Sequence, residues 1–200
     1  MMTLLNKALL TEALELAGSY LEDRGISVEV VGIGGSALLL LGFIERPTQD
    51  LDLIASVESG TYLKLDELPQ VLRETRDAVA AQLDLAPDWI NTEPCDVMDH
   101  GLPDGFADRC VKQTYGSLTL HLASRFDQIC LKLHAAADRG DPKGKHAHDL
   151  RALSPTADEL VTAARWAQTH DPSQGFRSVL LLVLTDFGVE NAENQLSPSV

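Results

Sequence analysis

The chain has 200 residues, of which 44% are hydrophobic and 23% are charged, which fits a soluble globular protein with a substantial core. Its 30 acidic residues outnumber the 16 basic ones, so the formal net charge is −14. Because affinity for nucleic acid depends largely on Lys and Arg, this balance excludes a general attraction to polyanions and leaves only a local basic patch or a partner chain.

The cysteines and the apolar runs indicate the cellular compartment of the protein. The odd number of cysteines (Cys95, Cys110 and Cys130) and the lack of a C-x-x-C spacing favour reduced thiols over disulfides or a zinc site. The apolar run at 179–184 is too short to span a bilayer, and polar residues interrupt the N-terminal leucines. We therefore expect a cytoplasmic protein with no membrane contact.

The first half of the chain mixes helical and strand patterns. Apolar spacing predicts amphipathic helices, alternation predicts short strands, and a glycine pair predicts a tight turn between a strand and a buried helix. The predicted order is helix 4–23, strand 27–31, helix 36–43, strand 50–55 and helix 66–83.

The second half is mainly helical. Prolines and glycines interrupt residues 86–115, which we interpret as a functional loop or as short elements without periodicity. After it we expect a strand at 118–122 and helices at 124–139, 145–153, 157–169 and 174–186. The predicted organisation is a core of residues 1–123, a helical part of residues 124–187 and a flexible tail of residues 188–200.

Two carboxylates stand out in the strand predicted at 50–55. Asp50 and Asp52 are two residues apart, so both side chains leave the same face, roughly 6.6 Å apart along the strand. They repel each other unless a cation lies between them, and Mg²⁺ is the hard cation that one or two carboxylates plus substrate phosphates hold. The alternative is an ordinary solvated strand face.

A second feature lies upstream of the carboxylates. Gly34, Gly35 and Ser36 stand between a predicted strand and a predicted helix, where backbone N–H groups and the helix dipole favour an anion. The Ser36 hydroxyl can either cap the helix or donate to a phosphate. An ordinary strand-to-helix turn is the alternative for the glycines alone.

The two features together, with Arg46 and Thr48 between them, resemble the signature of the DNA polymerase β-like nucleotidyltransferase superfamily. The form of residues 46–52 is similar to that of bacterial abortive-infection and type IV toxin–antitoxin nucleotidyltransferases. The resemblance implies an α+β nucleotidyltransferase fold, with a small mixed sheet flanked by helices and a helical C-terminal part. It also implies nucleotide binding by Gly34, Gly35, Ser36, Arg46 and Thr48, with Asp50 and Asp52 as catalytic metal ligands.

The same toxins carry a lysine on a helix after the last core strand and an aspartate on the next helix. Lys132 and Asp149 match these positions, so the resemblance implies that both are catalytic. Alternatively, Lys132 snorkels from a half-buried helix, and Asp149 forms a structural ion pair with Arg139.

Several residues depart from the pattern or leave two interpretations open. His148 stands where relatives usually have a basic residue before the aspartate, and Asp96 is the one candidate for a third carboxylate. The histidines at 134, 146 and 148 are expected on solvated helix faces rather than at a metal. Trp89 either stacks on a base or anchors the packing of its loop.

The predicted activity is transfer of a nucleoside monophosphate from an NTP to an acceptor hydroxyl, with Mg²⁺ as cofactor. The resemblance favours tRNA or another RNA 3′ end as acceptor, a toxin role in a toxin–antitoxin or phage-defence system, and a cognate antitoxin as partner. The net charge argues against a large RNA footprint. The alternatives are a protein or small-molecule acceptor, or a degenerate module that binds nucleotide or protein without turnover.

Overall fold

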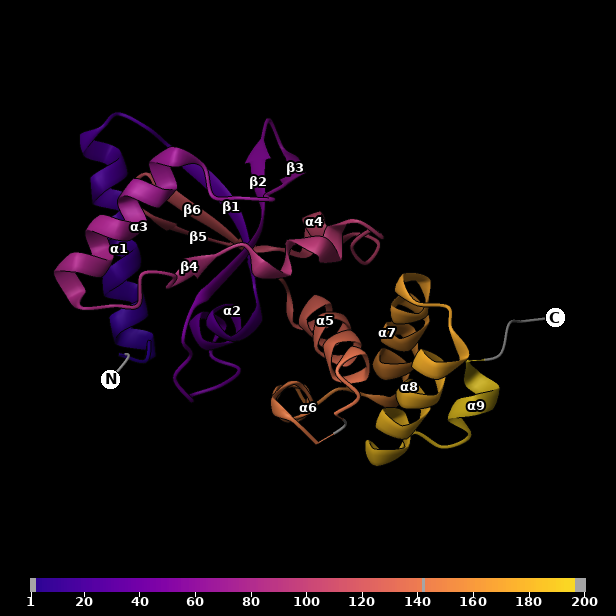
Figure 1. Cartoon of the computed structure of the whole chain (residues 1–200). Coiled ribbons are helices and arrows are strands. Elements are labelled where there is room, and N and C mark those ends of the chain that lie inside the picture. The colour runs from indigo at the N-terminus through magenta and orange to yellow at the C-terminus, as the bar shows by residue number, and fades with distance from the viewer. Residues whose placement is uncertain (1–2, 142, 197–200) are drawn as a thin grey trace. The chain divides into compact units, whose positions relative to one another are not determined.

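The computed structural model describes residues 3–141 and 143–196. The chain divides into two compact units, residues 1–124 and 125–200, and each is described here by itself (Figure 1). Sequence alternation and apolar periodicity explain both: the first unit combines strands with helices, and the described part of the second is helical.

Among the described residues of the first unit, six strands form one mixed sheet. The order is β3-β2-β1-β6-β5, and β4 pairs with β2 outside this path. Strand β1 runs antiparallel to β2 and parallel to β6, so the small mixed sheet expected from the sequence is confirmed. The bounds are β1 Val28–Ile33, β2 Leu51–Glu58, β3 Thr61–Lys64, β4 Ile90–Asn91, β5 Val111–Tyr115 and β6 Leu118–Leu122.

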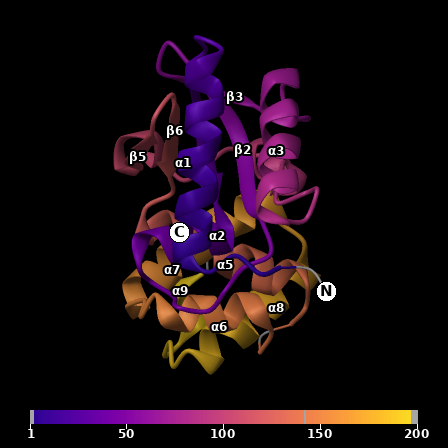
Figure 2. The same ribbon diagram turned by 90° about the vertical axis from the view of Figure 1, so that its left-hand side faces the viewer.

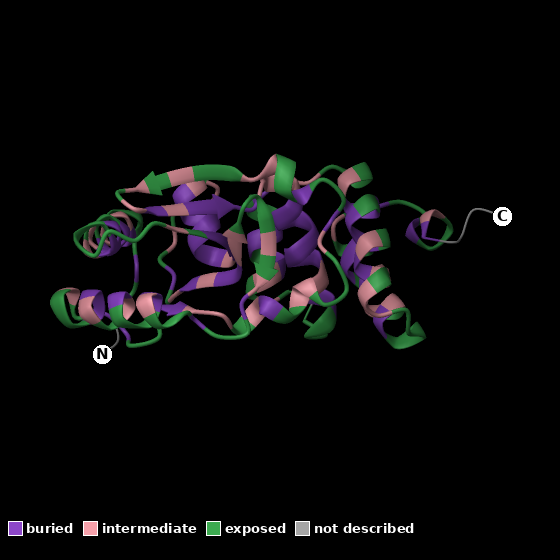
Figure 3. Ribbon diagram, turned by 90° about the horizontal axis from the view of Figure 1, so that it is seen from above, coloured by how far each residue is buried: buried purple, intermediate pink, exposed green. Residues whose placement is uncertain are grey.

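Helices of the first unit flank this sheet. Figure 2 shows α1 (Lys7–Asp23) and α3 (Gln70–Leu83) side by side in front of the strands. Their apolar faces are buried while their outer faces are exposed, as the colours of Figure 3 show for the whole chain. Helix α2 (Gly34–Leu41) differs, because five of its eight residues are Ala or Leu and its interior is buried all round. It therefore serves as a fixed support for whatever its N-terminus binds.

The segment between α3 and β6 contains short elements that could not be predicted from its Pro- and Gly-rich composition. It contains β4, a 3₁₀ helix η1 (Glu93–Met98), the four-residue α4 (Phe106–Arg109) and β5. β4, η1 and α4 are too short to show a period, and β5 (VKQTY) lacks the regular apolar alternation that β6 (LTLHL) has, so no element was predicted there. Trp89 is fully buried before β4, and its indole N–H donates to the carbonyl of Arg76 over 3.1 Å. Trp89 is therefore a packing anchor, and the base-stacking alternative is wrong.

The second unit is helical throughout its described residues. It comprises α5 Arg125–Asp138, α6 Lys145–Ala152, α7 Ala157–His170, α8 Gln174–Asp186 and α9 Ala192–Gln195. Helix α5 is the central one, because it packs against α6, α7 and α8. Side-chain caps fix two of the helix starts: Thr156 and Glu159 form a capping box on α7, and Ser173 accepts from the N–H of Phe176 on α8.

The segment after α8 differs from the flexible tail that we expected. Val189, Ala192 and Leu196 are buried and recur every three or four residues, the spacing that gives α9 an apolar side. Arg165 and Arg177 add hydrogen bonds to backbone carbonyls at 193–196. The last part of the expected tail, residues 197–200, lies outside the described residues.

None of the helices in the described ranges is both long and apolar enough to cross a membrane.

Candidate active site

The glycine turn and the first strand pair meet at one point of the first unit. Strand β1 ends at Ile33, α2 begins at Gly34, and Ile33 is in register with Asp52 on β2. Gly34 has a φ of +76°, and a Cβ at this position would overlap the Asp52 carboxylate. Only glycine combines that backbone angle with so close an approach. The turn and the second aspartate of the pair are therefore brought together, as the resemblance implies.

The start of α2 has backbone donors without a side-chain cap. Its N-cap residue is Ile33, which makes no capping hydrogen bond. Uncapped N–H groups at a helix start favour an anion such as a phosphate. Ser36 is not the cap: its hydroxyl is buried and donates to the backbone carbonyl of Asp50. That hydrogen bond ties the helix directly to the strand that carries the carboxylates.

Asp50 and Asp52 flank Leu51 at the start of β2. Leu51 is fully buried, whereas both aspartates are half-buried. Asp52 lies within β2, where alternation with Leu51 directs its carboxylate away from the core and against the start of α2, and Asp50 directly precedes the strand. Carboxylates are the donors that Mg²⁺ takes jointly with substrate phosphates.

Arg46 and Thr48 lie beside the same turn. Two backbone hydrogen bonds to Leu5, of 2.8 and 2.9 Å, hold Thr48 in place. A Cβ on Gly35 would lie 2.8 Å from the Thr48 hydroxyl and 3.9 Å from the Arg46 guanidinium. The Thr48 hydroxyl is buried and has no hydrogen-bond partner among the described residues. An unpaired buried hydroxyl is costly, so a ligand atom at this turn would satisfy it.

A third metal-binding carboxylate is not found in the described part of the chain. No group of three or more His, Cys, Asp or Glu residues there could hold a metal ion. Asp96 is exposed on η1 and lies 2.9 Å from the Lys64 ammonium, which its carboxylate shares with Asp99. Strand β4 instead places Asn91 in register with Asp52. The position beside the aspartate pair is thus held by a neutral amide.

Lys132 and Asp149 form an ion pair within the second unit. Lys132 Nζ on α5 lies 2.9 Å from an Asp149 carboxylate oxygen on α6, and both side chains are buried. Asp149 therefore pairs with Lys132, and the alternative pairing with Arg139 is not the one observed. The sequence pattern singled out both residues, but nothing in it indicated that they contact each other.

Buried polar atoms without hydrogen-bond partners lie on the same two helices as this ion pair. The amide group of Gln128 and both ring nitrogens of His146 are buried, with no hydrogen-bond partner among the described residues. Burial, followed by the charges of Lys132 and Arg139, lowers the pKa of His146 to about 4. His134 is half-buried, and its ring packs against those of Trp166, His170 and Phe176. Of the three histidines expected on solvated faces, His148 is the exposed one.

A nucleotidyltransferase-type core is formed by β1, the glycine turn, the buried helix α2 and the strand β2 with its aspartates. The chain belongs to a family described as nucleotidyltransferase of unknown function (DUF6036), whose model matches residues 8–148. No curated protein and no solved structure matches the chain. The family match confirms the nucleotidyltransferase fold, and its range includes the glycine turn, both aspartates and Lys132.

The close approach of Gly34 to Asp52 leads to a first prediction. Gly34→Ala should destabilise the fold and weaken binding of an NTP with Mg²⁺, because the new methyl group displaces the carboxylate. Gly60→Ala is the matched control: Gly60 also has a positive φ, of +82°, but a Cβ there has open space. Backbone strain alone should cost each variant about 1–2 kcal/mol. Urea unfolding and nucleotide titration measure both effects, and equal behaviour of the two variants would contradict the steric explanation.

The buried ion pair leads to a second prediction. Asp149→Asn removes the carboxylate charge 2.9 Å from the buried Lys132 ammonium and should lower the free energy of unfolding by about 3–5 kcal/mol. Asp186→Asn, in the more exposed pair with Arg151, should cost less than about 1 kcal/mol. Chemical denaturation compares the two, and a small effect at Asp149 would show that the pair contributes little.

Proposed function

We propose that this protein is a Mg²⁺-dependent nucleotidyltransferase that transfers a nucleoside monophosphate from an NTP to an acceptor hydroxyl. The observation that carries the proposal is the packing of the Asp52 carboxylate against the glycine turn that opens α2. A phosphate-binding helix start and a metal-binding carboxylate are then close enough to act on one triphosphate.

In the proposed reaction the acceptor oxygen attacks the α-phosphorus, and the bond to the pyrophosphate oxygen breaks. Gly34, Gly35 and the Thr48 hydroxyl bind phosphate oxygens, and Arg46 neutralises part of their charge. Asp50 and Asp52 would hold Mg²⁺, which supplies Lewis-acid stabilisation of the attacking and leaving oxygens. The acceptor proton leaves to a base, and the rest of the catalysis is positioning and electrostatics.

Lys132, on α5, is also proposed to take part in this reaction. Its match to the helix lysine of the toxin-type enzymes supports this role, and Lys132 lies within the residues 8–148 that the family model matches. Its ammonium either balances the charge of the triphosphate or, once deprotonated, removes the acceptor proton. Asp149 then positions Lys132 through the ion pair.

The proposal also includes a biological role. The toxin resemblance of residues 46–52 supports an RNA 3′ end as acceptor, a toxin role and an antitoxin partner. A net charge of −14 opposes a large RNA footprint, because affinity for many phosphates depends largely on Lys and Arg side chains.

A module that binds nucleotide without turnover is the second candidate. The observation that favours it is Asn91, a neutral side chain in register with Asp52 where a third carboxylate would help to activate an acceptor. Nucleotide binding without transfer to any acceptor would support this module and contradict the enzyme.

The carboxylates give the decisive test of transfer. Asp52→Asn should abolish Mg²⁺-dependent label transfer from an α-labelled NTP and weaken nucleotide binding, while the protein stays folded because like-charge repulsion is removed. Glu58→Gln, at the exposed far end of the same strand, is the control and should behave as wild type. Incubation with each NTP, Mg²⁺ and total RNA, followed by gel and thin-layer separation, measures transfer. Unchanged nucleotide binding with a large loss of stability in Asp52→Asn would instead mark a structural aspartate.

Lys132 is tested separately from the metal site. Lys132→Ala should slow single-turnover transfer by roughly 10²-fold, the scale expected when one preorganised charge is removed. Lys132→Arg should restore part of that rate, because a planar guanidinium replaces a compact ammonium imperfectly. Lys145→Ala removes an exposed ammonium from α6 and is the matched control. Equal rates for all of these proteins would remove Lys132 from the site.

A further inference from the structure

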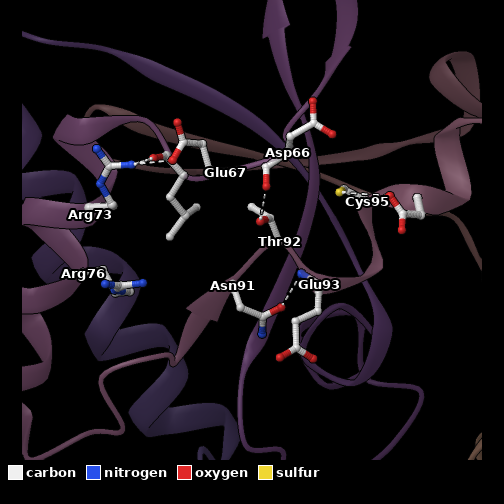
Figure 4. A pocket seen from close by; sticks show the side chains of 10 residues that line it. Asp66, Glu67, Arg73, Arg76, Asn91, Thr92, Glu93 and Cys95 are labelled. Atoms are coloured by element: carbon white, nitrogen blue, oxygen red, sulfur yellow. Dashed lines mark hydrogen bonds and ion pairs between the residues drawn. The ribbon is translucent and has the colours of Figure 1, made fainter.

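A pocket of about 520 Å³ opens in the first unit beside β4. Figure 4 shows its lining, with Asp66 and Glu67 on one side, Arg73 and Arg76 reaching in from α3, and Asn91 to Cys95 on the other side. Neither the glycine turn nor the aspartate pair belongs to this lining. The pocket is therefore a separate compartment whose relation to the candidate active site follows from the strand register.

The register places the pocket on a defined side of Asp52. Within the sheet, Asp52 is paired with Ile33 of β1 on one side and with Asn91 of β4 on the other. The glycine turn directly follows Ile33, and Asn91 is part of the pocket lining. Neighbouring strands are about 4.8 Å apart, so the phosphate-binding turn and the pocket flank the same carboxylate from opposite sides.

This arrangement matters because phosphoryl transfer is an in-line displacement. The attacking oxygen and the leaving oxygen lie on opposite sides of the phosphorus. A pyrophosphate that lies against Gly34 and Gly35, with its bond to the α-phosphorus directed along the sheet toward β4, would place the acceptor hydroxyl on the side of β4. The pocket at Asn91 lies on that side.

The charges of the lining indicate what kind of acceptor fits. The Arg73 guanidinium is taken up by Glu67 and the Leu68 carbonyl, and Arg76 donates to Asp77. The Lys64 ammonium is shared by three carboxylates, two of which, Asp66 and Asp96, line the pocket. Glu93, the first residue of η1, adds an exposed carboxylate to the lining. The lining thus has an excess of negative charge and of hydrogen-bond acceptors.

We infer that the pocket beside β4 binds the acceptor, and that the acceptor is a small hydroxylated molecule that carries a protonated amine. This inference rests on the proposed function. A volume of about 520 Å³ is within the range of small-molecule sites. A carboxylate-rich lining favours an amine and repels the phosphates of an RNA end. Asn91 is placed to orient the hydroxyl that attacks.

The test uses two ring polyols of similar size, 2-deoxystreptamine, which carries amines, and myo-inositol, which carries none. Each is offered to the full-length protein with Mg²⁺ and an α-labelled NTP, and tRNA is offered in parallel. The variant is Glu93→Gln, which removes one pocket carboxylate at constant volume, and Glu58→Gln removes an equal charge elsewhere. Binding of the NTP itself is measured in every protein.

We expect label transfer to 2-deoxystreptamine at least about 10-fold more efficient than to myo-inositol, and about 10-fold weaker in Glu93→Gln than in Glu58→Gln, the scale of one charge-assisted hydrogen bond. NTP binding should be the same in both variants. Transfer to tRNA alone would overturn the inference in favour of an RNA acceptor. Equal use of the two polyols, or no effect of Glu93→Gln, would show that pocket charge does not select the acceptor. Intact NTP binding with no transfer to either polyol would overturn the inference by itself, whereas loss of Mg²⁺-dependent NTP binding in wild type would mark failure of the proposed function.

Discussion

The approach of the Asp52 carboxylate to the backbone of Gly34 is the contact on which the rest of the first unit depends. Any side chain at residue 34 would push the two apart, so the glycine fixes how close β2 comes to the start of α2. The hydrogen bond from Ser36 to the Asp50 carbonyl reinforces the same junction. The buried leucines of α2 then hold the helix still, so that its first N–H groups face a fixed point.

In the proposed complex, that junction would bring like charges close together. Two aspartates beside a triphosphate raise the electrostatic energy of a chain that already has a net charge of −14. The proposed Mg²⁺ between the carboxylates and the phosphates offsets this energy, and Arg46 adds a positive charge near the turn. The same excess of negative charge continues into the pocket beside β4, where it favours an acceptor that brings its own positive charge. Charge thus connects the proposed cofactor with the inferred acceptor class.

The local features of this fold could be predicted from sequence, and the non-local ones could not. The helix from 174 to 186 and the strand from 118 to 122 agree with the predicted ranges, because each has a clear period. The pairing of β4 with β2 involves two residues, too few for any pattern, and it brings Asn91 to Asp52 from nearly forty residues away in sequence. Gly34 and Asp52 were predicted from their residue types and spacing to belong to one site, whereas the ion pair of Lys132 and Asp149 was not predicted. The ring contacts of His134 and the burial of the His146 ring nitrogens were also missed, because a histidine carries no sequence signal for which of its neighbours will cover it.

The polar interior of the second unit has a cost that a purely structural helix bundle would avoid. Gln128 and His146 bury polar atoms without partners, and the ion pair of Lys132 and Asp149 gives up hydration on both groups. Apolar residues of similar size would pack there at lower cost. The lowered pKa of His146 keeps its ring neutral at neutral pH, so it adds no charge beside Lys132. The unfolded chain takes up that proton near pH 6.5, so the contribution of a neutral His146 to stability is lost as the pH falls from there toward 4. Burial of the ion pair of Lys132 and Asp149 therefore costs free energy that packing alone does not require, and the proposed role of Lys132 in transfer would explain why the pair is buried.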